Sequence, residues 1–315
     1  MKSGEEKPTS LLPGDCPICL SARSREVYAG EDEVVARFGK GGLCRISLRR
    51  CRDCGMMFLG NLDFTPEEVH EAYWNLLQSS SLASYSVDPE ARIFRPESLD
   101  PYRRLNRVLE IGCGEGALLR LLRERGWSVA GTDIALPVVE LARRRHGIEV
   151  IRATLDERLL AALGEGSFDA VIMWGLLEHL PAPLPALRLC HRLLRPGGGL
   201  VVYTPNAGGI FHRLAWLSYR ATAGRCAAGM KRVIVAMHRI YFTPRTLRAA
   251  LAASGFRLAS LSPVDIDLKH VFSAPASFRW SNRGTYWLAR ALQRAGSRLG
   301  LNSHLLAVAE REAAE

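Results

Sequence analysis

The chain has 315 residues, of which 48% are hydrophobic and 23% are charged, and its formal net charge at pH 7 is +10. These proportions are ordinary for a soluble globular protein, and the length allows two domains or one domain with a small module. The start of the chain lacks the apolar core of a secretory signal, and no stretch reaches the ~18 apolar residues that a spanning helix needs. We therefore expect a cytoplasmic protein with reduced cysteines.

Two Cys-x-x-Cys knuckles near the start of the chain have the spacing of a metal site. Cys16 and Cys19 form the first knuckle, and Cys51 and Cys54 form the second. Two intervening residues allow both sulfurs of a knuckle to face one tetrahedral ion, and four thiolates make a closed structural zinc site. Short strands at 33–38 and 45–49 would complete a zinc-ribbon-like module. Four free thiols in a small core, or a redox pair, are the alternatives.

The rest of the chain alternates apolar strand patterns with amphipathic helix patterns. We expect a metal-binding module at 1–60, a helical connector at 61–104, and a main domain at 105–315 with insertions at 206–240 and 264–302. Strands are expected near 107–111, 127–132, 148–152, 168–173, 198–203, 256–263 and 303–310, and helices near 116–125, 136–146, 182–195 and 244–254. This alternation favours an α/β fold whose mostly parallel sheet carries helices on both faces.

A glycine-rich turn follows the first of these strands. Gly112, Gly114 and Gly116 separate the apolar run 108–111 from a helical stretch. Glycine tolerates positive φ and a close ligand, and the helix start attracts anionic groups. Asp133 lies about 20 residues further on, where an acidic side chain can bind ribose hydroxyls. The third glycine comes one residue too early for a dinucleotide fingerprint. A nicotinamide site and a turn without ligand are the weaker alternatives.

This turn, with Glu110 before it, resembles motif I of the class I S-adenosylmethionine (SAM) dependent methyltransferases. Segments 167–174, 176–180 and 193–202 resemble the fourth strand, the Leu-Glu-His segment and the Pro-Gly-Gly turn of that family. The resemblance covers about 105–262 and implies a Rossmann-like seven-stranded sheet, SAM as the cofactor and methyl transfer. An N-terminal zinc ribbon before such a domain resembles sugar C-methyltransferases and one type of ribosomal RNA methyltransferase.

The resemblance also implies roles for individual residues. Around SAM it places the methionine part at the loop, the ribose at an acidic side chain, and the adenine among apolar neighbours. The residues that match these positions are Glu110, Gly112, Gly114, Asp133, Ile134, Thr154, Leu155 and Trp174. Candidates for a catalytic base are His179, His238 and Tyr241, and a structural hydrogen-bonding role is the alternative for each histidine.

The positive charge concentrates in the insertions. Between 206 and 300 there are fifteen Lys and Arg residues and only two acidic residues. The net positive charge of this segment is therefore larger than that of the whole chain. Segments 206–240 and 281–300 are amphipathic, and in the second an arginine stripe runs beside Trp287 and Leu288. This pattern fits a lid helix packed on the protein, a helix lying on a membrane surface, or a surface for nucleic acid.

We therefore expect a SAM-dependent methyltransferase acting at oxygen on a small-molecule, glycan or lipid acceptor, with structural zinc. An RNA methyltransferase and a non-catalytic SAM-binding module are the rivals. Nucleic acid is the weaker partner, because the fourth strand ends in Met173-Trp174-Gly175-Leu176 and base-amino methylases carry an Asn/Asp-Pro-Pro-aromatic tetrad there. Contact at the inner membrane surface through the insertions is an open expectation, and the sequence makes no prediction of oligomeric state.

Overall fold

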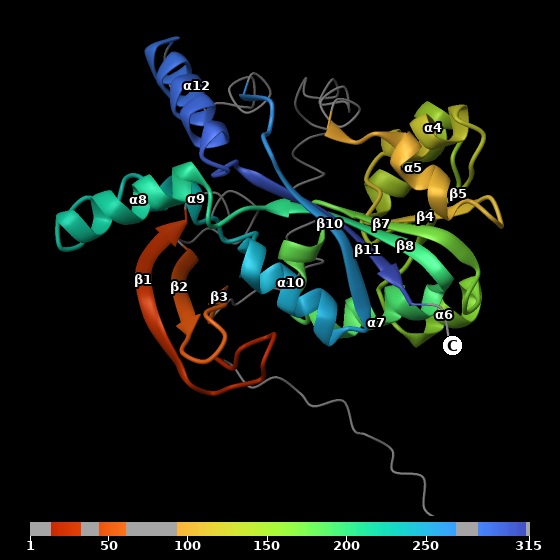
Figure 1. Ribbon diagram of the computed structural model, residues 1–315, viewed down its shortest axis with the longest axis horizontal. Helices are drawn as coiled ribbons and strands as arrows, with labels where there is room; N and C mark the ends of the chain where they lie inside the picture. Colours follow the sequence, from red (N-terminus) through yellow and green to blue (C-terminus); the bar gives the residue numbers. More distant parts are fainter. Residues whose placement is uncertain (1–13, 33–43, 61–92, 269–282, 313–315) are drawn as a thin grey trace, which may run out of the picture.

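The computed structural model describes residues 14–32, 44–60, 93–268 and 283–312. Within them the chain forms a seven-stranded sheet and a separate four-stranded sheet (Figure 1). The expected strand 33–38 and most of the expected connector, 61–92, lie outside the described residues. The described part of the connector contains a 3-10 helix, η3 (Pro96–Tyr102).

The large sheet is mostly parallel. In spatial order it contains β10 (Phe256–Val264), β11 (His304–Arg311), β8 (Leu194–Pro205), β7 (Phe168–Trp174), β4 (Arg107–Ile111), β5 (Ser128–Asp133) and β6 (Val150–Arg152). Strands β4 to β8 run parallel, and β11 is antiparallel to both β8 and β10. Every residue of β7 is buried, as expected for a central strand covered on both faces.

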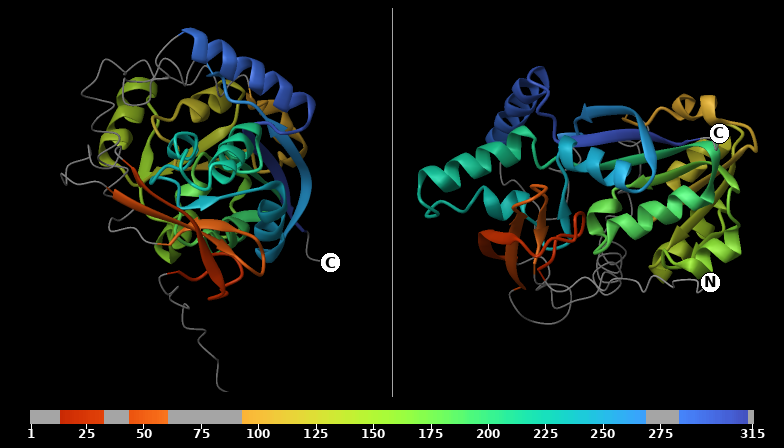
Figure 2. Two further views of the ribbon diagram at one scale, coloured as in Figure 1. Left: turned by 90° about the vertical axis from the view of Figure 1, so that its left-hand side faces the viewer. Right: turned by 60° about the horizontal axis from the view of Figure 1, so that its bottom comes forward.

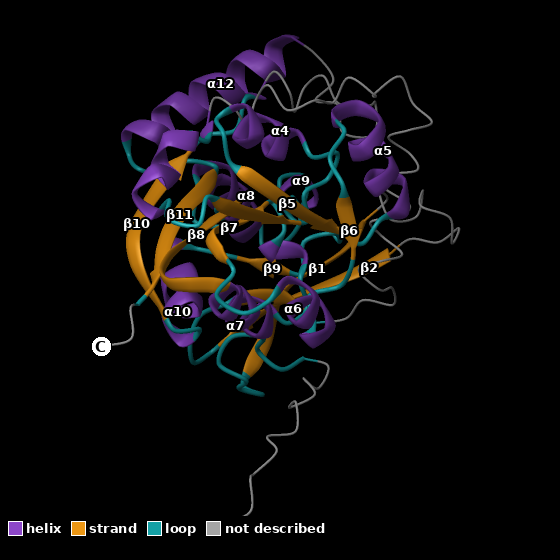
Figure 3. Ribbon diagram, turned by 90° about the vertical axis from the view of Figure 1, so that its right-hand side faces the viewer, coloured by secondary structure: helices purple, strands orange, loops and turns teal. Residues whose placement is uncertain are grey.

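Helices cover both faces of this sheet, and Figure 3 shows the layers. One face packs against η3 and α4 (Ala117–Glu124), and α5 (Leu136–His146) lies beside α4. The opposite face packs against α6 (Glu157–Leu163), α7 (Pro183–Leu193) and α10 (Pro244–Ala253). Asp156 caps α6 by accepting bonds from two backbone N–H groups, and a Thr243–Thr246 capping box starts α10.

The small sheet is antiparallel and draws on two distant parts of the chain. Its order is β1 (Ser24–Asp32), β2 (Cys44–Cys51), β3 (Met57–Leu59) and β9 (Ile240–Tyr241). Met57 pairs with Tyr241 and Phe58 with Ile240, and the Leu59 N–H donates to the Arg239 carbonyl. The cysteine-containing segment is therefore hydrogen-bonded to the segment that precedes α10.

Two helices extend beyond the carboxyl end of the large sheet. They are α8 (Ile210–Ala221), with the short α9 (Met230–Val233) after it, and α12 (Arg283–Arg298). Figures 1 and 2 show them on the side of the molecule away from α4 and α6. They meet where Gly296 of α12 lies against Ile210 of α8. Among the described residues, no helix is both long enough and apolar enough to cross a membrane.

The expected fold is confirmed, with differences at the edges of elements. All seven expected strands of the large sheet are present, and the four expected helices begin and end within two residues of their predicted bounds. Strand β8 begins earlier than expected, at Leu194, because the predicted Pro-Gly-Gly turn pairs with β7 across a register shift. Helix α6 and strand β1 were not predicted. The α6 segment is too short to carry a clear helical period.

Candidate functional site

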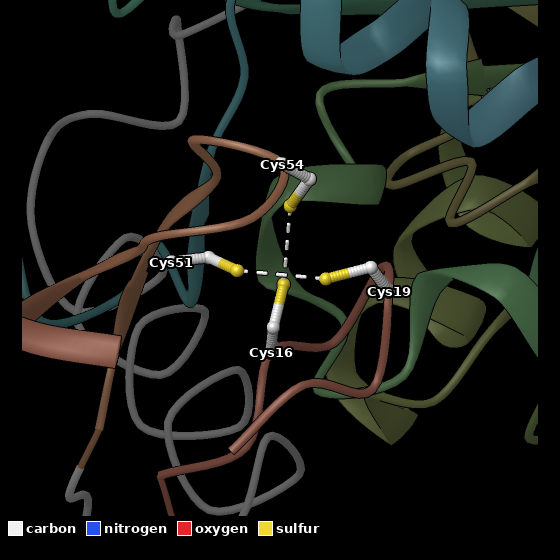
Figure 4. Close-up of side chains that lie close together, drawn as sticks. All are labelled: Cys16, Cys19, Cys51 and Cys54. Carbon is white, nitrogen blue, oxygen red and sulfur yellow. Dashed lines mark hydrogen bonds between the residues drawn. The ribbon is translucent and has the colours of Figure 1, made fainter. Parts of the chain in front are cut away.

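The four knuckle cysteines converge on one point, as Figure 4 shows. The Cys16 and Cys54 sulfurs are 3.5 Å apart, and so are those of Cys19 and Cys51. All four sulfurs lie within 4.8 Å of one another. The turns that bring them together include the left-handed Gly55 after the second knuckle and a bond from the Asp53 N–H to the Cys51 sulfur.

The spacing of these sulfurs fits a tetrahedral metal. A zinc ion with sulfurs at about 2.3 Å places neighbouring sulfurs about 3.8 Å apart, close to the separations seen here, whereas a disulfide needs about 2 Å. Burial raises the pKa of the Cys16 thiol above its usual range. A buried thiol with a raised pKa holds its proton, so binding of a metal at this cluster must release protons.

The glycine loop joins the carboxyl end of β4 to α4. Gly112, Gly114 and Gly116 all have positive φ, between +55° and +78°. The N–H groups of Gly112 and Cys113 both donate to the Thr132 carbonyl of β5, at 2.8 and 3.0 Å. A Cβ at Gly112 would lie 2.9 Å from a methyl group of Leu176. The loop therefore requires glycine both for its backbone conformation and for the close approach of Leu176.

Asp133 ends β5 beside this loop. Its buried carboxylate accepts bonds from the Gly114 N–H at 3.1 Å and the Ala135 N–H at 3.0 Å. Each carboxylate oxygen can accept more than one hydrogen bond, so a carboxylate fixed in this way can also take ribose hydroxyls. The loop and Asp133 thus form a cradle at the carboxyl edge of the sheet, where ligands bind in open α/β folds.

The other residues predicted to bind SAM have different surroundings. Glu110 is buried at the end of β4, and Ile134 is half-buried next to Asp133. The Thr154 hydroxyl donates to Asp156, the cap of α6, and Leu155 packs against the core. Trp174 stacks on Tyr203 with ring centroids 4.2 Å apart, and Tyr203 stacks on His304 at 4.9 Å.

His179 lies just beyond the carboxyl end of β7, in the 3-10 helix η4 (Leu177–His179). Its Nδ1 lies 2.9 Å from the Met237 carbonyl oxygen, and its Nε2 lies 3.9 Å from a carboxylate oxygen of Glu178. Because a carbonyl only accepts, Nδ1 carries the proton, and Nε2 of the neutral ring carries a lone pair. The His179 side chain keeps 13% of its surface exposed, so a ligand can reach it.

Glu178 is the buried neighbour of this histidine. The Thr204 hydroxyl donates to its carboxylate at 2.9 Å, and the Arg239 N–H donates to its backbone carbonyl at 2.7 Å. Burial raises the pKa of Glu178 to about 7, against the lowering effect of its hydrogen bonds. The Arg239 bond also connects η4 to the strand β9 region of the small sheet.

The other two base candidates are placed differently. The His238 ring contacts the His179 ring edge-on, with centroids 4.9 Å apart. Burial lowers the pKa of His238 to about 3, with smaller contributions from His304 and His212. The Tyr241 hydroxyl accepts from the Val235 N–H and donates to the Val235 carbonyl, so it fixes a turn of its own chain. The three candidates form a row of ring contacts, because the Tyr241 ring also lies edge-on to the His238 ring, with centroids 6.2 Å apart.

Several residues at this edge were not predicted as site residues. Leu176 packs on Gly112, Glu178 adjoins His179, and His304 extends the ring stack. Leu176 and Glu178 belong to segment 176–180, which resembles the Leu-Glu-His segment of the family. The signal for Glu178 is therefore its place next to His179 in that segment. No sequence signal identifies His304, because it comes from β11 at the end of the chain.

The seven-stranded sheet with helices on both faces is a Rossmann-like methyltransferase fold. A family model for the methyltransferase domain matches residues 87–261, more than half of the chain. The chain therefore belongs to the methyltransferase domain family.

Curated relatives match only part of the chain. It is 43% identical over 105 residues to a protein of Xanthomonas oryzae pv. oryzae named ubiquinone biosynthesis O-methyltransferase, covering 32% of this chain and 43% of that one. A Pseudomonas aeruginosa protein of the same name is 38% identical over 103 residues, covering 32% and 44%. The chain thus spans less than half the length of these two relatives.

Solved structures share the fold. The chain matches the (4+2)-cyclase SpnF with a TM-score of 0.50 and 18% identity, covering 80% of this chain and 98% of that one. It also matches a chain from a complex of a Haloferax volcanii methyltransferase activator with a methyltransferase, with a TM-score of 0.51 and 16% identity, covering 79% and 96%.

Proposed function

We propose that this enzyme transfers the SAM methyl group to a hydroxyl oxygen of a small-molecule, glycan or lipid acceptor, with His179 as the general base. The observation that carries the proposal is the bond from His179 Nδ1 to the Met237 carbonyl, which leaves Nε2 as the basic nitrogen of a ring just beyond the carboxyl end of β7. The name of the partial relatives, an O-methyltransferase, supports oxygen as the target atom.

Bound SAM supplies an activated methyl group on a sulfonium. In the proposed arrangement Gly112 and Gly114 border its methionine part, Asp133 binds the ribose hydroxyls, and Ile134 covers the adenine. Glu110 orders the loop, Trp174 closes one side through its stack, and Thr154 and Leu155 lie near the adenine. Because the methyl group is already activated, much of the rate comes from holding the acceptor oxygen in line with the methyl carbon.

His179 would take the proton that the acceptor loses. The oxygen–carbon bond forms as the carbon–sulfur bond breaks, sulfur keeps the electron pair, and the hydroxyl proton moves to His179 Nε2. The resulting imidazolium lies 3.9 Å from the Glu178 carboxylate, which stabilises the positive charge when it is ionised. Met237 fixes the ring, so the lone pair needs no reorientation during the reaction.

The cysteine cluster is proposed to hold structural zinc. Four thiolates leave no open position for a substrate on a tetrahedral ion, so the metal would fix the fold and take no part in catalysis. Its effect on the site runs through the small sheet, because β3 pairs with β9 and the Arg239 N–H next to β9 holds Glu178.

The insertions are proposed to bind an anionic membrane surface. The outward face of α12 exposes 60% of both Trp287 and Leu288, and 70% of Leu299 is exposed just after it. Arg290, Arg294 and Arg298 lie along one edge of this face, and neither α8 nor α12 contains an acidic residue. An apolar face beside a cationic edge is the pattern of helices that lie in the lipid interface.

The test of the proposed function is transfer of labelled methyl from SAM into a cell extract that is then separated into lipid, soluble and RNA fractions. Label in the lipid or soluble fraction is expected, and label confined to RNA overturns the proposal. SAM binding without transfer to any fraction would identify a non-catalytic module.

His179→Gln tests the base. We expect turnover to fall about 100-fold or more, with SAM affinity unchanged. The control is His146→Gln, which changes a histidine at the end of α5. Equal turnover of the two variants would exclude His179 as the base.

A further inference from the structure

A cavity beside the cysteine cluster is lined by arginines that the proposed function does not use. Its volume is about 470 Å³, within the range of small-molecule sites. The guanidinium groups come from Arg25, Arg50 and Arg52 of the cysteine-containing module and from Arg245 of α10. We call these four residues and their cavity the arginine pocket. Cys51, Asp53, Cys54 and Gly55 form the rest of its lining.

Two arginines of this pocket are cross-strand neighbours, and the acid in its lining is paired with an arginine outside the pocket. Arg25 and Arg50 are directly opposite in the β1–β2 pairing, a placement in which like charges destabilise a sheet. Within the part of the chain that the structure describes, none of the four guanidinium groups forms an ion pair. The lining acid, Asp53, is bonded to Arg23 and Ser21.

The metal cluster does not balance this charge. A zinc ion held by four thiolates carries a net charge of about −2. Four guanidinium groups exceed that by about two positive charges, since Arg23 and Asp53 cancel each other. The pocket therefore keeps an excess of positive charge that favours a polyanionic ligand.

Two of these arginines have surroundings that favour an anion. The Arg50 Nη2 atom lies 3.8 Å from the point that a Cβ would occupy on Gly55, so the guanidinium is held against the knuckle turn. Arg245 lies in the first turn of α10, where the helix dipole adds to the attraction of an anion. Guanidinium forks bind phosphate oxygens in pairs, and four of them offer more donors than one phosphate uses.

We infer that the arginine pocket binds the diphosphate group of a ligand, at a site separate from the SAM cradle. A cavity of this volume is larger than a diphosphate, so it leaves room for part of the organic group that the diphosphate carries. That group can belong to a soluble nucleoside diphosphate or to a lipid diphosphate, which share the same recognition chemistry.

The experiment is isothermal titration of the zinc-loaded full chain with inorganic pyrophosphate, uridine diphosphate and farnesyl diphosphate. Saturable binding of pyrophosphate and of at least one ester is expected, and the ester that binds identifies the source. The double variant Arg50→Gln, Arg245→Gln should bind at least tenfold more weakly. The matched control is Arg188→Gln, Arg248→Gln, which removes two exposed arginines of α7 and α10 outside the pocket, and it should bind like the unchanged chain.

Zinc content is measured before and after each titration, because pyrophosphate itself binds zinc. SAM affinity should be equal in both double variants, so failure of the arginine pocket is distinguishable from failure of the SAM cradle. The inference is overturned by no binding at millimolar concentration, by equal weakening in both double variants, or by binding of pyrophosphate with neither ester. It is also overturned if an RNA oligonucleotide binds and pyrophosphate does not compete with it.

Discussion

His179 and His238 touch each other, yet their surroundings give them different chemistry. Both rings are partly buried, but His179 is oriented by the Met237 carbonyl, whereas desolvation lowers the pKa of His238 to about 3. A ring with a pKa this low can position its neighbour but accepts a proton poorly near pH 7. We therefore propose the basic role for His179 and a packing role for His238.

The lowered pKa of His238 predicts a loss of stability in acid. The folded-state pKa is about 3, and the ordinary value is about 6.5. Below pH 6.5 the unfolded chain gains a proton that the folded chain does not, so the free energy of unfolding falls as the pH falls toward 3. For one histidine this loss is about 1.4 kcal/mol between pH 7.5 and 5.5.

The measurement is urea denaturation of the unchanged chain and of His238→Gln at both pH values. The variant should lose about 1.4 kcal/mol less than the unchanged chain on acidification. An identical pH dependence in the two proteins would mean that His238 is accessible to protons in the folded state.

The loop between β4 and α4 depends on glycine for two separable reasons. Gly112 has positive φ and also faces Leu176, whereas Gly147 at the end of α5 has a similar φ of +59° and no neighbour within 4 Å of its Cβ position. Gly147→Ala therefore measures the cost of the backbone conformation alone. Gly112→Ala adds displacement of Leu176.

We expect Gly112→Ala to weaken SAM binding at least tenfold and to cost about 1 kcal/mol more stability than Gly147→Ala. SAM binding by Gly147→Ala should equal that of the unchanged chain. Calorimetric titration with SAM measures the affinities, and thermal unfolding measures the stabilities. Unimpaired SAM binding by Gly112→Ala would place the ligand elsewhere.

The local sequence pattern predicted the strands and helices of the large sheet. It did not predict which distant segments pair with one another. Apolar runs, proline starts and glycine ends mark β4, β7, α5 and α10, because they depend on local residues. The pairing of β3 with β9 joins residues nearly 200 positions apart, and no local period encodes such a contact. In the same way, the tautomer of His179 depends on the Met237 carbonyl, which only the folded chain brings near.

The cysteine cluster is connected to the η4 region through the pairing of β3 with β9. Cys51→Ser removes one thiolate, and we expect loss of zinc, a clear fall in the melting temperature and loss of methyl transfer. SAM binding should persist, because the glycine loop belongs to the other sheet. Cys226→Ser is the control, since Cys226 is exposed and lies outside the cluster. Full zinc content in Cys51→Ser would contradict the assignment.

At the scale of the whole molecule, α8 and α12 form a side that carries exposed apolar residues and arginines. Neither helix contains an acidic residue. We expect flotation with vesicles that contain phosphatidylglycerol, and little with neutral phosphatidylcholine vesicles, because the arginine edge needs anionic headgroups. Trp287→Ser with Leu288→Ser should abolish flotation and leave turnover of a soluble acceptor unchanged. Leu105→Ser, another exposed leucine, is the control. Equal flotation with both vesicle types would exclude binding that depends on anionic headgroups.

The shared strand pairing limits how this enzyme can be re-engineered. A chimera that receives the first 60 residues of another methyltransferase also receives a new partner for Ile240 and Tyr241. The transplanted ribbon must offer a strand with the same register as Met57 and Phe58, or the Arg239 bond to Glu178 shifts. Exchange of the amino-terminal module is therefore also an exchange of the strand that pairs with β9, beside the Arg239 bond to Glu178.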